Sequence, residues 1–150
     1  MKTTKNADRT RRKAQASTGA QDCRDRDVPW AVGRRVLVVE DDYMLALTLC
    51  ERLERDGAVV IGPAGSVAEA LALLDAEAAP DSAILDTHLE DEESYPLADV
   101  LLSRRIPFVL ATNSEAWMIP SAYLSHPRTE KPVDLRRVAH ALDPRGLAAP

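Results

Sequence analysis

The sequence of 150 residues has few aromatic side chains, few cysteines and no long hydrophobic segment. Phe, Trp and Tyr make up 4% of the residues, so Leu, Val, Ile and Ala must build most of any core. The two cysteines, Cys23 and Cys50, are too few for a disulfide framework and match no metal-ligand spacing. Apolar runs such as Val36–Val39 are far shorter than the roughly 20 residues of a transmembrane helix. The sequence therefore excludes a disulfide-rich domain and a membrane span.

Charge is distributed unevenly along the chain. Residues 1–35 carry ten Lys or Arg and four Asp, a net charge of +6, whereas residues 36–150 have a net charge of −11. A basic arm is typical of nucleic-acid-binding proteins, but residues 1–33 show no hydrophobic periodicity. We expect them to be a disordered leader, or to lie upstream of the true start codon, and we expect no nucleic-acid partner. They also lack the apolar stretch of a secretory signal, so we expect a cytoplasmic protein.

From Arg35 onward, short runs rich in β-branched residues alternate with helical patterns. Strands are expected at 36–39, 58–61, 82–86, 106–111 and 128–130, the first two buried, and helices at 44–53, 66–78, 96–104 and 135–142. Pro120 interrupts the only helical pattern in 114–126. The alternation predicts an α/β domain at 34–143 with a short C-terminal tail at 144–150. The expected fold is a flavodoxin-like, doubly wound five-stranded parallel sheet with strand order 2-1-3-4-5.

Acidic residues, a threonine and a lysine follow the C-terminal ends of these strands: Glu40, Asp41, Asp42, Asp86, Thr112 and Lys131. Ligands of doubly wound sheets bind at this edge. Crowded carboxylates repel one another unless a cation joins them, and Mg²⁺ prefers carboxylate and phosphate oxygens. Asp86 is central, which makes it the best candidate nucleophile for an acyl phosphate. The simpler alternative for the first three acids is a solvated strand end with Asp42 as a helix N-cap.

Four segments in this order, RVLVVEDDYMLA, SAILD, PFVLATN and EKPVD, resemble the receiver domain of bacterial two-component response regulators over residues 35–142. The resemblance implies a non-enzymatic protein in which Asp86 accepts a phosphoryl group from a sensor histidine kinase or a phosphotransfer protein. It implies an Mg²⁺ ion held by Glu40, Asp41, Asp86 and the backbone carbonyl of His88. It also implies that Thr112 and Lys131 contact the phosphoryl group, and that the Lys131-Pro132 bond is cis.

Some positions depart from the usual receiver pattern. The loop 87–94 has no Pro or Gly and carries four acidic residues, and Arg128 stands where many receivers have an aromatic residue on the fifth strand. The Leu97-Ala98-Asp99 triplet and the Ile106-Pro107 pair resemble an atypical group of stand-alone receivers. We expect no output domain after Pro150, and we expect signalling through contact with an unknown downstream protein. A homodimer is left open.

Two other functions fit parts of the pattern. The acidic loop and the missing aromatic residue also suit a receiver-like protein-binding module that works without phosphorylation. A Mg²⁺-dependent phosphatase of the haloacid type would use an aspartate nucleophile as well. That class needs a second Asp two residues after the first, where this chain has His88.

Overall fold

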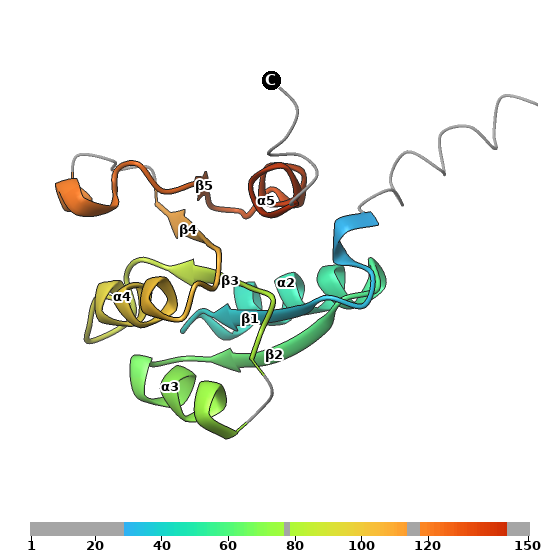
Figure 1. Ribbon diagram of the computed structural model, residues 1–150, viewed down its shortest axis with the longest axis horizontal. Coiled ribbons are helices and arrows are strands. Elements are labelled where there is room, and N and C mark those ends of the chain that lie inside the picture. The colour runs from blue at the N-terminus through green and yellow to red at the C-terminus, as the bar shows by residue number, and fades with distance from the viewer. Residues whose placement is uncertain (1–28, 77–78, 114–117, 144–150) are drawn as a thin grey trace, which may run out of the picture.

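A computed structural model describes residues 29–76, 79–113 and 118–143. Five parallel strands form one sheet in the order β2-β1-β3-β4-β5 (Figure 1). The strands are β1 (Arg35–Val39), β2 (Val59–Ala64), β3 (Ser82–Asp86), β4 (Phe108–Thr112) and β5 (Arg128–Glu130). The helices are α2 (Tyr43–Arg55), α3 (Val67–Ala76), α4 (Tyr95–Ser103) and α5 (Leu135–Leu142), with 3-10 turns η1 (Pro29–Ala31) and η3 (Ser121–Tyr123). The predicted fold class and strand order are confirmed.

The sheet is covered on both faces, which gives the domain two hydrophobic cores. Along β1, Val36 and Val38 pack into one core with α2 and α5, whereas Leu37 and Val39 pack into the other with α3 and α4. This alternation follows from the two-residue period of a strand. Because both faces are covered, β1 reads as a continuous run of apolar residues.

Three helices begin with side-chain caps close to the polar edge of the sheet. The Asp42 carboxylate accepts a hydrogen bond from the Leu45 N–H at the start of α2, and Asp134 accepts one from the Arg136 N–H at the start of α5. At α3, the Ser66 hydroxyl accepts a hydrogen bond from the Glu69 N–H. Asp42, Asp134 and Ser66 are therefore the N-caps of these helices.

The second strand differs from its prediction as a strand buried on both faces. β2 lies at the edge of the sheet, and its Val59 side chain is 50% exposed. The strand also continues to Ala64, past the run of apolar residues that predicted it. An edge strand has a neighbour on one side only, so its side chains are less fully covered than those of β1 or β3.

The packed domain includes residues upstream of position 34, where the sequence places its start. Trp30 is 3% exposed and Ala31 is fully buried, and both belong to the core that α2 and α5 cover. The Gly33 N–H donates a hydrogen bond of 2.9 Å to the Gly57 carbonyl, which ties this segment to the end of α2. Residues 1–28 and 144–150, the larger part of the expected tails, lie outside the described residues.

The segment between β4 and β5 contains no regular helix in its described part. After Pro120 the chain forms the short turn η3, as the interruption by Pro120 predicts, while residues 114–117 lie outside the described residues.

Across the described ranges, no helix has the length and apolar character needed to cross a membrane.

Candidate functional site

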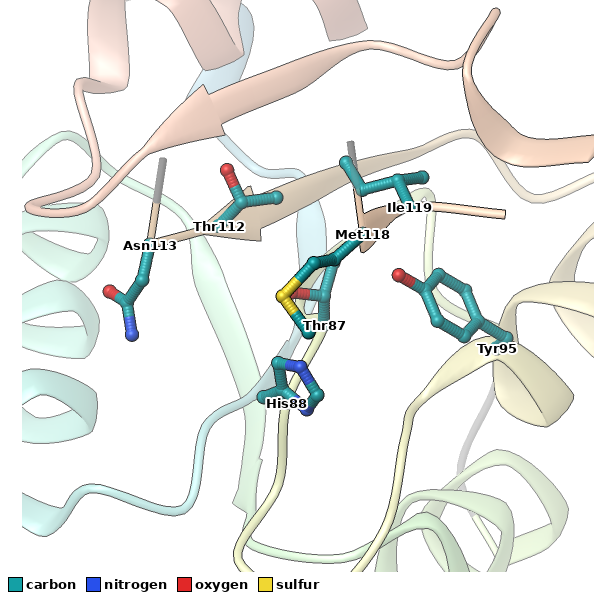
Figure 2. Close-up of a pocket in the computed structure, with 7 residues that line it drawn as sticks. All are labelled: Thr87, His88, Tyr95, Thr112, Asn113, Met118 and Ile119. Atoms are coloured by element: carbon teal, nitrogen blue, oxygen red, sulfur yellow. The ribbon is translucent and has the colours of Figure 1, made fainter. Parts of the chain in front are cut away.

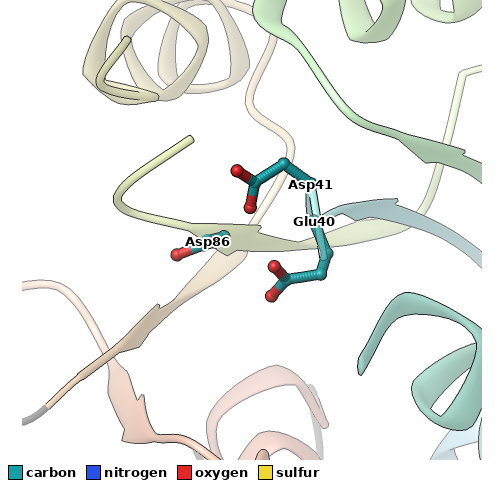
Figure 3. A group of neighbouring side chains, drawn as sticks. All are labelled: Glu40, Asp41 and Asp86. Carbon is teal, nitrogen blue, oxygen red and sulfur yellow. The ribbon is translucent and has the colours of Figure 1, made fainter. Parts of the chain in front are cut away.

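Three carboxylates meet where β1 and β3 end. β1 and β3 are adjacent parallel strands, so the residues that follow Val39 and the last residue of β3, Asp86, reach the same edge of the sheet. One carboxylate oxygen from each of Glu40, Asp41 and Asp86 lies within 4.8 Å of the others (Figure 3). Glu40 and Asp86 are buried, whereas Asp41 is exposed. The sequence-based expectation that these acids lie together agrees with this geometry.

Lys131 supplies the positive charge of this cluster. Its Nζ atom lies 2.8 Å from Asp86 Oδ2 and 2.9 Å from Glu40 Oε2. The three side chains are nearly inaccessible, with exposed fractions of 10% for Lys131, 6% for Glu40 and 4% for Asp86. Charged hydrogen bonds at this distance are strong where water is excluded. Lys131 therefore holds the two buried carboxylates side by side.

Burial and the neighbouring charges set the proton affinities in the cluster. Burial raises the pKa of Glu40 to about 7, although the hydrogen bonds from Lys131 and from the Asp42 N–H act in the opposite direction. Burial alone would lower the pKa of Lys131, but its hydrogen bonds to Asp86 and Glu40 raise it. The ammonium thus remains charged, while the site still lacks positive charge for all three carboxylates.

This donor set fits a divalent cation that prefers oxygen ligands. Carboxylates at the ends of two neighbouring strands, one of them exposed, give an ion access from solvent. Mg²⁺ binds through one or two carboxylates and keeps several ligand positions for water and phosphate oxygens. His or Cys ligands of the kind that zinc prefers are absent from this group of described residues.

The chain after Asp86 turns tightly next to the acidic cluster. The His88 N–H donates a hydrogen bond of 3.2 Å to Asp86 Oδ1, and the Thr87 N–H donates to the Ala111 carbonyl. His88 and Glu93 form an antiparallel bridge that closes the loop. Asp86 is therefore oriented by its own loop on one side and by Lys131 on the other.

Thr112 lies beside Asp86 at the end of the next strand. Asp86 is paired with Ala111 in the sheet, so Thr112 extends one residue beyond the carboxylate. The Lys131 N–H donates a hydrogen bond of 2.9 Å to the Thr112 carbonyl, which fixes the β5 end against the β4 end. The sequence-predicted residues Asp86, Thr112 and Lys131 thus meet at one edge, and the predicted cis Lys131-Pro132 bond is present.

One acidic residue of the loop has a structural contact that the sequence did not indicate. The Glu92 carboxylate accepts a hydrogen bond of 2.9 Å from the Val67 N–H and so caps the start of α3. Leu89 of the same loop is buried in the core. The exposed side chains of Glu90, Asp91 and Glu93 remain around the site as a negative rim. No local pattern predicts the Glu92 cap, because its partner lies 25 residues away.

Arg128 at the start of β5 is exposed, as expected for a guanidinium that has no apolar position to fill. The only buried residue of β5 is Thr129. Its hydroxyl accepts a hydrogen bond from the Asp134 N–H near the start of α5. β5 therefore contributes no aromatic side chain to the interior beside Thr112.

Comparisons with known proteins agree with this architecture, although no family model matches the chain. SdrG from Sphingomonas melonis Fr1 is 34% identical and has a TM-score of 0.64, over 79% of this chain and 98% of SdrG. The non-phosphorylated receiver domain of HemR from Leptospira biflexa is 29% identical with a TM-score of 0.61, over 73% of this chain and 94% of that one.

A curated relative is similar over a shorter stretch. The transcriptional regulatory protein PdtaR of Mycobacterium tuberculosis is 34% identical over 87 residues, which are 57% of this chain and 42% of PdtaR. The matched region is thus less than half of that relative. SdrG, by contrast, is matched over nearly its whole length. With the strand order, the acidic cluster and the lysine in place, the chain belongs to the receiver domains of response regulators.

Proposed function

We propose that this chain is a cytoplasmic receiver that takes a phosphoryl group onto Asp86 from a histidine kinase or phosphotransfer protein and signals by protein contact. The observation that carries the proposal is the position of Lys131, whose ammonium contacts both Asp86 and Glu40 in a cluster of three carboxylates. Such an arrangement suits a carboxylate nucleophile beside a divalent cation.

Each residue of the cluster has a role in this proposal. Asp41, Asp86 and the His88 carbonyl would hold Mg²⁺, and Glu40 would act on the ion through water. When bound, Mg²⁺ offsets the negative charge of the phosphoryl oxygens. Lys131 and Thr112 would hold the phosphoryl oxygens from the β5 and β4 sides.

The transfer itself is a displacement at phosphorus. An Asp86 carboxylate oxygen forms the new bond to phosphorus, while the bond between phosphorus and the histidine nitrogen of the donor breaks. The electron pair of that bond stays on the leaving imidazole, which is protonated from solvent. The negative rim of Glu90, Asp91 and Glu93 favours a donor protein with a basic surface around its phosphohistidine.

The experiment is incubation with acetyl phosphate, with and without Mg²⁺, followed by intact-mass measurement. We expect one added phosphoryl group that requires Mg²⁺, is absent from Asp86→Asn and is retained in Asp91→Asn, a matched change at an exposed acid of the neighbouring loop. We expect Asp41→Asn to slow the reaction, because it removes one Mg²⁺ ligand. A parent protein that stays unmodified by acetyl phosphate and by phosphorylated phosphotransfer proteins would instead be a phosphorylation-independent binding module.

A further inference from the structure

The loop 87–94, which follows the proposed phosphoacceptor, borders open space on one side. Its first two residues, Thr87 and His88, line a cavity of about 330 Å³ together with Thr112 at the end of β4 (Figure 2). Packing therefore does not hold His88 on this side. The loop also lacks Pro, which would restrict its backbone. The position of the His88 carbonyl, a proposed Mg²⁺ ligand, thus depends on contacts that the loop makes elsewhere.

Hydrogen bonds within the loop link its first residues to those at its far end. The Ser94 N–H donates to the Thr87 carbonyl at 3.2 Å, and the Leu89 N–H donates to the Glu92 carbonyl at 2.9 Å. The Leu89 side chain is buried in the core that α3 and α4 cover. Because Glu92 is bonded to the residue next to His88, a contact that holds Glu92 also limits the movement of His88.

The Glu92 side chain attaches this loop to the turn between β2 and α3. Its carboxylate accepts a hydrogen bond of 2.9 Å from the Val67 N–H at the start of α3, where the helix dipole also favours a negative charge. The same turn contacts the end of β1, because the Glu40 N–H donates a hydrogen bond of 2.9 Å to the Ala64 carbonyl. The turn, residues 64–67, therefore contacts both segments that carry proposed Mg²⁺ ligands.

We propose that Glu92 is a positioning residue for the Mg²⁺ site, an inference that rests on the receiver function proposed above. By binding the turn 64–67, Glu92 keeps the His88 carbonyl in a fixed position relative to the carboxylates that follow β1. Without this contact the loop samples other conformations, and only the fraction of molecules with the loop in place offers the ion its full set of ligands. The apparent affinity for Mg²⁺ then falls in proportion to that fraction.

Charge alone is the competing explanation, because an acidic residue near the site also attracts a cation. Glu90 separates the two effects, since it is an exposed acid of the same loop. If charge acts alone, neutralising Glu90 or Glu92 weakens Mg²⁺ binding to a similar, small extent at about 0.15 M ionic strength, where exposed charges are screened. If the contact acts, the loss of affinity requires loss of the acceptor oxygen of Glu92.

The test is the Mg²⁺ affinity of the full chain, measured by titration of its backbone amide resonances. We expect Glu92→Ala to weaken binding about fivefold and Glu90→Ala to weaken it less than about twofold. Glu92→Gln keeps an acceptor oxygen at the same reach, so its affinity should match that of Glu90→Gln. Lower stability by itself does not change the affinity of the folded protein, so a purely structural role for Glu92 predicts no such difference.

A change at the hydrogen-bond donor gives an independent variant. Val67→Pro removes the N–H that Glu92 binds and leaves every charge in place, and proline is accepted at the first position of a helix. We expect it to weaken Mg²⁺ binding as much as Glu92→Ala does, and the double variant to bind no more weakly than either single one. Val67→Ala, which keeps the N–H and removes the buried side chain, is the control and should bind Mg²⁺ like the parent.

Amide hydrogen exchange without Mg²⁺ reports on the loop itself. Residues 87–94 should exchange faster in Glu92→Ala than in Glu90→Ala. Failure of the parent to bind Mg²⁺ would overturn the proposed function. Binding by the parent with equal affinity and equal loop exchange in Glu92→Ala and Glu90→Ala, or with Glu92→Gln as weak as Glu92→Ala, would overturn the role of Glu92 alone.

Discussion

The ammonium of Lys131 lies 2.8 Å from a carboxylate oxygen of Asp86, and both side chains are almost completely removed from solvent. Glu40 forms an ion pair with the same ammonium, so two buried carboxylates share one positive charge. Replacing such a lysine leaves uncompensated negative charge inside the protein, which is more costly than the loss of an exposed ion pair. The stability of this edge of the sheet therefore depends on the same residues that surround the proposed phosphoacceptor Asp86.

The first prediction concerns Lys131→Met without Mg²⁺. We expect the free energy of unfolding to fall by about 1–3 kcal/mol, because Asp86 and Glu40 lose their shared partner. Added Mg²⁺ should stabilise the variant more than the parent, since the ion then supplies the missing positive charge. Urea unfolding with and without Mg²⁺ measures both effects. Arg104→Met, which removes an exposed pair with Asp75, is the control and should cost less than about 1 kcal/mol. Equal stabilisation of parent and Lys131→Met by Mg²⁺ would contradict the prediction.

The second prediction concerns the start of the folded domain. A variant that begins at Pro29 keeps the burial of Trp30 and Ala31, whereas one that begins at Arg34 loses both. Loss of a buried Trp side chain typically costs about 3–5 kcal/mol. We therefore expect a thermal midpoint close to that of the full chain for the first variant and a clearly lower one for the second. Equal midpoints for the two truncations would show that Trp30 contributes little to stability.

The third prediction concerns the cap on α3. Glu92→Ala leaves the Val67 N–H without its acceptor, and such a loss typically costs about 1 kcal/mol. Glu90→Ala removes the same charge from an exposed position of the same loop and should change stability by less than half as much. The urea concentrations at the unfolding midpoints of the two variants and the parent measure this difference in stability. If both variants match the parent, the contact between Glu92 and Val67 does not stabilise the protein.

The fourth prediction concerns the ionisation of Tyr123. Its hydrogen bond to Asp99, together with burial, raises its pKa from 10.0 to about 12. The neutral phenol is thus favoured in the folded state, so its contribution to stability is complete below pH 10 and is lost as the pH rises toward 12. Spectrophotometric titration of phenolate should show a late step that is absent from Tyr123→Phe and shifts to lower pH in Asp99→Asn. A late step that persists unchanged in Asp99→Asn would exclude this hydrogen bond as the cause.

The fold and the acidic cluster could be predicted because they depend on short sequence patterns. Continuous apolar strands such as β1 and β3 indicate a parallel sheet, and parallel strands bring the residues at their C-terminal ends to one edge. Glu40, Asp86 and Lys131 could thus be placed together without knowledge of the side-chain packing. Contacts between separate elements could not be predicted in this way. A single Trp30 after a polar segment carries no periodic signal, and the stack of Tyr95 on Tyr123 depends on how the η3 segment packs on α4.

The central claim is that Asp86 is the residue that carries the phosphoryl group. After treatment with acetyl phosphate and Mg²⁺, borohydride reduces an aspartyl phosphate to homoserine, which peptide sequencing by mass spectrometry locates. The account predicts homoserine in place of Asp86, and unreduced side chains at Glu40, Asp41 and the acids of the neighbouring loop, where a glutamyl phosphate would instead give 5-hydroxynorvaline. Reduction at any other acidic residue, with Asp86 unchanged, would contradict it.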